Sequence, residues 1–247
     1  MVLPKGKSCS INGKKYEKSI HKIVSNCELN GNLFNTQSVD ELGGCSANND
    51  ILCNFQTEND IGIEIKKYNT PDWMQCSIKY NVDDKKWETS KNGKIPKECS
   101  QIFEELIQNK VLFQGGIPPF FYQQITHKEW LDIKKSTNQW NDFYFDIPND
   151  TIQNLYSIKK CQYIQLSNGF GLYHLGIDLC KFDVPEFKTE QQIRIRTKIH
   201  SKSNKNGYCT LSVTAACQPK NIKLLEPSLY SLDDKNLLPK NLQYFRF

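Results

Sequence analysis

Short runs of alternating apolar and polar residues, separated by polar turns, recur along this chain and predict β-strands. The clearest example is residues 50–66, in which an apolar run, a polar turn and an alternating run follow one another. Because side chains alternate across a strand, the isoleucines of residues 61–66 are expected on one face, with Glu64 and Lys66 on the other. The stretch therefore predicts two strands joined as a hairpin.

Pairing of these two strands would bring Asp50, at the start of the first, close to the end of the second. Two carboxylates and a lysine would then converge, as metal-assisted attack of water on a phosphodiester requires. The triplet acid-x-Lys is a weak signal by itself, because it also begins at Asp83, Asp84, Asp132, Glu186 and Asp233. Only Glu64 combines it with an alternating strand preceded by another acid. The alternative is an edge strand with a solvated charged face.

Helical periodicity appears first in residues 14–26, where apolar side chains recur three and four residues apart. Glu17 borders this apolar stripe, so its carboxylate is expected either to turn toward Asp50 or to lie on the surface beside lysines. Similar patterns predict helices over residues 98–110, 127–136 and 151–160. Further strands are predicted at residues 163–166 and 171–175. Helices and strands together predict an α+β (α/β) fold with a mixed central sheet flanked by helices.

A Gly-Gly-Ile-Pro-Pro turn at residues 115–119 is the best candidate boundary in the chain. We therefore expect a core over residues 1–115 and an extension, β-rich toward its C-terminus, over residues 116–247, packed on the core as one unit. The start of the extension is dense in aromatic residues, for which core packing is favoured over stacking on unpaired bases.

The second informative pattern is a predicted hairpin over residues 193–217, in which apolar residues alternate with basic ones. No acidic residue interrupts the run between Ile193 and Tyr208, and a cationic ribbon of this kind suits a phosphate backbone or a DNA groove. The alternative is a solvated basic face that protects a sheet edge. The five basic residues expected to bind nucleic acid are Arg194, Arg196, Lys198, Lys202 and Lys205.

Composition refines this interpretation only slightly. The 247 residues carry a net charge of +5, with 38% apolar and 24% charged residues, as in ordinary globular proteins. No apolar run approaches the length of a membrane-spanning helix, and the first residues are too polar for a secretory signal, so an intracellular protein of cytoplasm or nucleus is expected. The ten cysteines form no Cys-x-x-Cys pair. We expect reduced core thiols and no structural zinc site.

Asp50, thirteen intervening residues and then Glu64-Ile65-Lys66 resemble the PD-(D/E)xK nuclease superfamily, which includes restriction endonucleases. Asn49 stands where the family usually has a proline. The resemblance covers about the first hundred residues and implies a restriction-endonuclease-like core. It also implies Mg²⁺, replaceable by Mn²⁺, bound by Asp50, Glu64 and the Ile65 carbonyl, with Lys66 and Glu17 as further catalytic residues. Gln75 loosely resembles a glutamine that follows the lysine in RecB-type members.

These observations predict a metal-dependent endonuclease that hydrolyses DNA, similar to a type II restriction enzyme. Two alternatives remain open at this stage. One is an RNA endonuclease, because the phosphodiester chemistry is shared, and the other is a non-catalytic nucleic-acid-binding protein with a nuclease-like fold. We expect nucleic acid as the partner, no membrane association, and a homodimer as one possible assembly.

Overall fold

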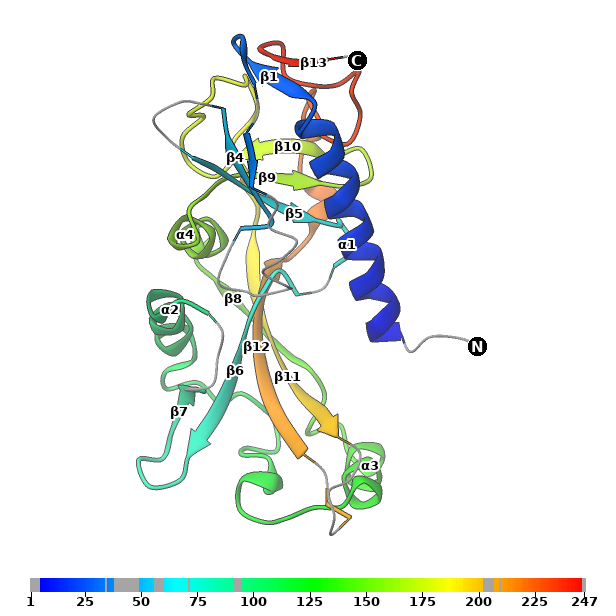
Figure 1. The fold of residues 1–247 in the computed structure, drawn as a ribbon. Coiled ribbons are helices and arrows are strands. Elements are labelled where there is room, and N and C mark those ends of the chain that lie inside the picture. The colour runs from blue at the N-terminus through cyan, green and yellow to red at the C-terminus, as the bar shows by residue number, and fades with distance from the viewer. Residues whose placement is uncertain are drawn as a thin grey trace. The chain divides into compact units, whose positions relative to one another are not determined.

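The computed structural model describes residues 5–33, 35–37, 49–55, 60–70, 72–90, 95–201, 207–208 and 210–245. It contains four α-helices and three β-sheets within those residues, which confirms the predicted α+β class (Figure 1). The chain divides into two compact units. Unit 1 consists of Met1–Pro71, Ile152–Thr189 and Asn221–Phe247, and unit 2 consists of Asp72–Thr151 and Glu190–Lys220.

Unit 1 is built on a five-stranded mixed sheet. Its order is β10 (Gly171–His174), β9 (Cys161–Leu166), β5 (Ile61–Lys66), β4 (Ile51–Asn54) and β3 (Asn35–Gln37). The predicted hairpin is present, because β4 pairs antiparallel with β5. On its other side β5 pairs parallel with β9, so the strand that carries Glu64 is central and not at an edge. The solvated-edge alternative is therefore wrong.

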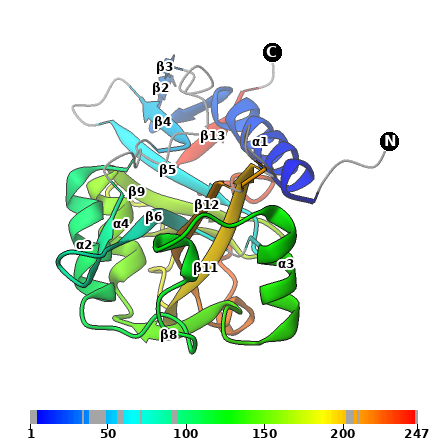
Figure 2. The same ribbon diagram turned by 90° about the horizontal axis from the view of Figure 1, so that it is seen from below.

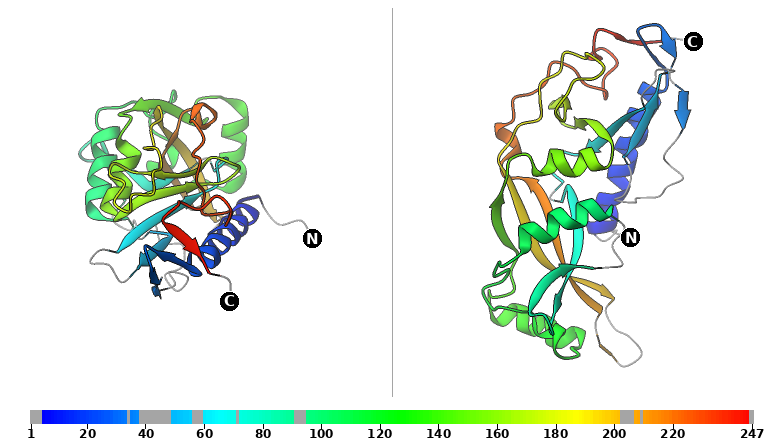
Figure 3. Two further views of the ribbon diagram at one scale, coloured as in Figure 1. Left: turned by 90° about the horizontal axis from the view of Figure 1, so that it is seen from above. Right: turned by 90° about the vertical axis from the view of Figure 1, so that its left-hand side faces the viewer.

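Two helices lie on opposite faces of this sheet, α1 (Lys5–Val24) and α4 (Thr151–Ile158) (Figures 1 and 3). The isoleucines of β5 are buried in the same hydrophobic cluster as Ile20 and Val24 of α1. Helix α1 begins at Lys5, nine residues before the predicted start at residue 14. The prediction missed residues 5–13 because their sequence lacks the apolar stripe that indicates a helix.

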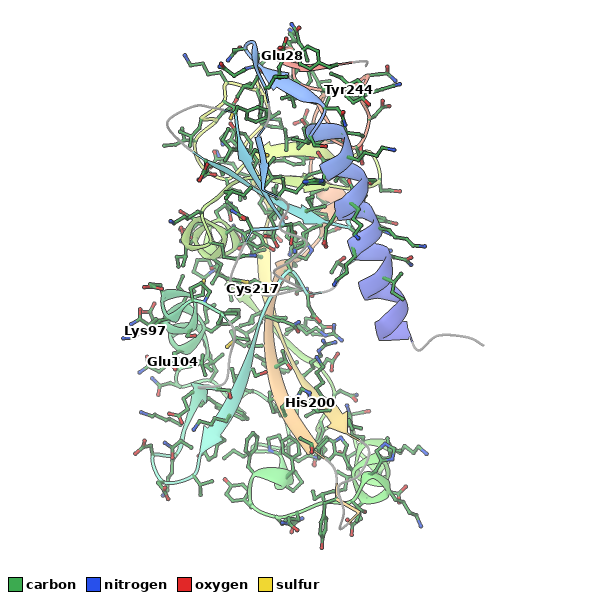
Figure 4. All side chains as sticks on the ribbon, viewed as in Figure 1. Glu28, Lys97, Glu104, His200, Cys217 and Tyr244 are labelled. Atoms are coloured by element: carbon green, nitrogen blue, oxygen red, sulfur yellow. The ribbon has the colours of Figure 1, made fainter. Side chains whose placement is uncertain are left out.

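A smaller sheet and the C-terminal segment complete unit 1. The sheet has the order β13 (Leu242–Tyr244), β1 (Cys27–Leu29) and β2 (Asn32–Leu33), and Glu28 lies opposite Gln243, next to Tyr244 (Figure 4). The C-terminal segment includes a 3-10 helix, Ile222–Leu224, and is joined to β9 through a hydrogen bond from the Leu232 amide to the buried Gln165 side chain at 2.9 Å. This tail is therefore part of the folded unit.

Unit 2 contains a five-stranded antiparallel sheet. Its order is β7 (Lys86–Thr89), β6 (Met74–Asn81), β12 (Thr210–Pro219), β11 (Gln191–Ser201) and β8 (Phe143–Ile147). Helix α2 (Lys97–Ile107) is joined to β7 by Glu104, which accepts hydrogen bonds from the backbone and hydroxyl of Thr89 at 3.1 and 2.6 Å (Figure 4).

Helix α3 (His127–Ser136) has the bounds that the sequence predicted, and Thr126 forms a capping box with Glu129. Figure 2 shows α3 beside β11, which Lys134 contacts through Thr197 at 3.2 Å. The aromatic residues of this region pack mainly on one another, as Trp130 does between Phe120 and Trp140, near the 3-10 helix Pro119–Phe121. Trp130 is 1% exposed, which agrees with core packing.

This division differs from the expected boundary at residues 115 and 116. Helix α2, which was expected in the nuclease-like core, belongs to unit 2, as does Gln75. The difference arises because β5 pairs with β9, about a hundred residues later, whereas the Gly-Gly-Ile-Pro-Pro segment is a turn inside unit 2. Local turn signals mark where a chain reverses, and they do not show which strands pair.

Among the cysteines whose side chains the structure describes, seven are buried free thiols: Cys27, Cys53, Cys76, Cys99, Cys161, Cys180 and Cys217. In the described part of the chain, no helix is long and apolar enough to cross a membrane.

Candidate active site

The β4–β5 hairpin places Asp50 beside the end of β5. Ile51 lies opposite Ile63 in the antiparallel register, so Asp50 is adjacent to the Glu64-Ile65-Lys66 segment. Its Oδ2 accepts a hydrogen bond from the backbone N–H of Ile65 at 2.8 Å and lies 3.7 Å from Lys66 Nζ. Strand pairing thus brings Asp50 next to Glu64, fourteen positions later in the sequence, as the sequence pattern predicted.

Glu64 is the most buried charged side chain of the site, at 2% exposure. One carboxylate oxygen accepts a hydrogen bond from Lys66, and the other is 2.8 Å from Lys159 Nζ. Burial opposes ionisation, but the two lysines outweigh it and lower the pKa of Glu64. The carboxylate is therefore charged at neutral pH, and its charge is balanced within the protein.

Lys66 connects the two carboxylates. Its side chain is 16% exposed, and its ammonium also lies 5.9 Å from the centre of the Tyr156 ring. Burial alone would lower the pKa of Lys66, yet Glu64 and Asp50 raise it well above the usual value. In this arrangement Lys66 is a cation, suited to orienting a water and to offsetting charge on a phosphate.

Asp50 and Glu17 are less readily ionised. Burial and the charge of Glu64 raise the pKa of Asp50, and burial and the charge of Asp50 raise the pKa of Glu17 to about 7. Glu17 lies on α1 and is partly buried. Its electrostatic coupling to Asp50 fits a carboxylate turned toward the site better than a purely surface glutamate.

Three residues of this site were not predicted. Lys159, which follows α4, contacts Glu64 Oε2. Cys161 Sγ lies 3.7 Å from the same oxygen. The buried Tyr156 ring lies 5.2 Å from Lys159 Nζ. A signal existed in the sequence, because Lys159 continues the buried stripe of Ile152, Leu155 and Tyr156 at helical spacing. A lysine on such a stripe requires a buried acid as its partner, but the sequence does not show which one.

Gly62 allows α4 and β9 to reach this position. A Cβ atom on Gly62 would lie 2.1 Å from the carbonyl oxygen of Lys160, and the Gly62 amide donates a hydrogen bond to the Gln162 side chain at 2.6 Å. The backbone after α4 therefore lies directly against β5. This close approach places Lys159 next to Glu64.

Residues on the predicted basic hairpin are paired with acids that the local sequence did not show. Arg194 binds Asp142 through Nε at 2.9 Å and Asp72 at 3.3 Å, while Arg196 binds Asp72 at 2.6 Å. Lys198 is exposed, and Lys202 and Lys205 lie outside the described residues. Strand β11 itself contains no acidic residue, but Asp72 and Asp142 come from other segments of unit 2 and neutralise its arginines.

Gln75 is exposed on β6 opposite Ala216, in unit 2. The structure therefore does not bring Gln75 together with Asp50, Glu64 and Lys66 within unit 1.

Mg²⁺ requires oxygen ligands, which Asp and Glu side chains supply best. Nowhere in the described ranges do three or more His, Cys, Asp or Glu side chains form a group that could hold a metal ion. Mg²⁺ often uses only one or two carboxylates and keeps several waters. Asp50 meets this need, since its Oδ1 has no hydrogen-bond partner among the described residues. Glu64 could supply a second oxygen where Lys66 now binds, and the Ile65 carbonyl remains a predicted third ligand.

Comparison of the chain with protein-family models, with curated proteins and with solved structures gave no match.

Proposed function

We propose that this protein is a metal-dependent nuclease of the PD-(D/E)xK type that hydrolyses DNA, with Mg²⁺ or Mn²⁺ as its cofactor. The observation that carries this proposal is the convergence of Asp50, Glu64 and Lys66 at neighbouring positions of two paired strands. A mixed sheet with a helix on each face (Figure 3) is also the core that the resemblance implies.

The chain's own groups divide the work of hydrolysis. Asp50 Oδ1 and one oxygen of Glu64 would hold the divalent cation, which would lower the pKa of a water and stabilise charge on the phosphate. Lys66 orients the attacking water, whose oxygen bonds to phosphorus as one ester P–O bond breaks. The water loses a proton and the leaving alkoxide gains one. Glu17, whose pKa is about 7, is suited to exchange protons with waters near Asp50.

Unit 2 is proposed to bind the nucleic acid through β11 and the basic residues that follow it in the sequence. Of the three predicted contacts that the structure describes, Lys198 is the one free to contact phosphates, because it is exposed on β11 whereas Arg194 and Arg196 already neutralise aspartates. Lys202 and Lys205 remain proposed contacts.

A second candidate has its own supporting observation. Both oxygens of Glu64 are engaged by lysines, which is also how a purely structural buried ion-pair cluster would look. In that case the protein would bind nucleic acid without cleaving it.

The deciding experiment is cleavage of supercoiled plasmid by the wild type and by Asp50→Asn, with Mg²⁺ and with EDTA. Asparagine can still accept the Ile65 N–H bond, so the variant should fold. Asp83→Asn is the matched control, because Asp83 begins another acid-x-Lys triplet but is exposed in a turn of unit 2. We expect cleavage by the wild type and Asp83→Asn only, and only with Mg²⁺.

A single-stranded RNA and a DNA of the same sequence, tested in parallel, separate the two nuclease alternatives. Cleavage of RNA alone would replace DNA by RNA in the proposal. Binding without cleavage of either substrate, unchanged in Asp50→Asn, would favour the non-catalytic protein.

A further inference from the structure

Lys159 is a buried cation to which the proposed hydrolysis assigns no role. Its side chain is 3% exposed, and its ammonium contacts Glu64 Oε2 at 2.8 Å and lies over the Tyr156 ring. A buried lysine is costly unless it is paired, so the contact with Glu64 is the reason that Lys159 can be accommodated there.

The two lysines that contact Glu64 differ in their freedom to move. Lys66 is 16% exposed and is shared between Glu64 and Asp50, so it can turn away from Glu64 without being left unpaired. Lys159 is enclosed, and the backbone beside it is fixed against β5 by the close approach at Gly62. Oε1 is therefore the oxygen that Glu64 can offer to a cation, whereas Oε2 remains bound to Lys159.

We infer that Lys159 is a positioning residue that holds Glu64 by Oε2 and limits this site to one divalent cation. This inference rests on the proposed function and specifies its metal stoichiometry. It follows from where Lys159 lies, in the place next to Oε2 that a second cation would need.

The charges of the side chains in the site also favour a single divalent cation. Asp50 and Glu64 are matched by Lys66 and Lys159, so the four side chains together carry no net charge when all are ionised. One divalent cation can be balanced by the phosphate of the substrate and by Glu17. A second cation would find no further carboxylate among the described residues of the site, and it would face Lys159 at short range.

The experiment is a titration of the full-length protein with Mn²⁺, without substrate, in which free Mn²⁺ is followed by electron paramagnetic resonance. The wild type should bind one ion. Lys159→Met, which keeps the length of the side chain but removes the charge, should bind the first ion about tenfold more tightly and should bind a second. Lys159→Arg, which keeps the charge, should bind one ion with wild-type affinity.

Cleavage measured on the same preparations separates positioning from simple stability. Lys159→Met should cleave more slowly at saturating Mn²⁺ although it binds the ion better, because Glu64 Oε2 is no longer held. A merely structural role would reduce binding and cleavage together, in parallel with the melting temperature, and would overturn the inference.

Two ions bound by the wild type, or one ion bound equally by the wild type and Lys159→Met, would also overturn the inference while leaving the nuclease proposal intact. A wild-type stoichiometry of two overturns the inference even if Lys159→Met fails to fold. No Mn²⁺ binding by the wild type would overturn the proposed function, and this inference with it.

Discussion

The surroundings of Glu64 in the structure go beyond what its position in the sequence indicates. In the sequence it is the single acid of an alternating strand, whereas in the structure it is enclosed and bound by Lys66 of the same strand and by Lys159, which follows α4. Because Lys159 remains in place, removal of Lys66 leaves the Glu64 carboxylate paired. The catalytic role of Lys66 can therefore be tested without leaving the buried Glu64 carboxylate unpaired.

Lys66→Ala should reduce cleavage by about a hundredfold or more, since it removes the group proposed to orient water and offset phosphate charge. Binding of DNA should stay near the wild-type value in a gel shift. Lys67→Ala is the matched control, because it changes the neighbouring lysine, which lies beyond the end of β5. Wild-type cleavage rates in Lys66→Ala would rule out the catalytic assignment.

Arg194 and Lys198 lie on the same strand but should respond differently to truncation. Arg194→Ala leaves Asp142 without its ion-pair partner and Asp72 with Arg196 alone. The variant should be destabilised by about 1–3 kcal/mol in thermal or urea unfolding. Lys198→Ala should leave stability unchanged, weaken DNA binding, and lower the salt slope of binding by about 1. Equal salt slopes for Lys198→Ala and the wild type would contradict a phosphate contact.

At the scale of elements, β5 is the strand on which the site is built. It pairs with β4 on one side and with β9 on the other, and both of its faces are buried. The alternation of apolar and charged residues predicted the two faces correctly. It could not show that the charged face would be covered by α4, because that depends on a parallel pairing across a long insertion.

Gly62 and Gly13 provide a matched test of this packing. Gly62→Ala would force its Cβ against the Lys160 carbonyl, and should destabilise the protein by about 1–3 kcal/mol. Gly13→Ala, inside α1, meets only an ordinary contact with Glu17 at 3.8 Å and should stabilise by about 0.5–1 kcal/mol. Urea unfolding measures both changes, and equal effects would argue against the close approach at Gly62.

At the scale of the whole molecule, the chain passes between the two units four times, after Pro71, Thr151, Thr189 and Lys220. Neither unit is a continuous stretch of sequence. Unit 1 takes β9, β10 and α4 from the later part of the chain, and unit 2 takes β11 and β12 from it.

A fragment of residues 1–115 should therefore not fold, although the turn at residues 115–119 resembles a domain boundary. The fragment lacks β9 and α4, which cover β5, and so exposes the core of unit 1. Amide dispersion in NMR spectra of the fragment, compared with the full chain, measures this directly. A well-dispersed spectrum of the fragment would favour the boundary at residue 115.

The sequence by itself determined the local elements of this protein. Periodicity located α3 at its observed bounds, the β4–β5 hairpin with Asp50 beside Glu64 and Lys66, and the long β11–β12 hairpin, because these depend on residues close together in the chain. Tertiary structure alone decided that Lys159 would reach Glu64 from 95 residues away, and that Asp72 and Asp142 would neutralise Arg194. Contacts between distant segments depend on the order of the strands and on the burial that this order produces. Local sequence patterns predict neither the strand order nor that burial.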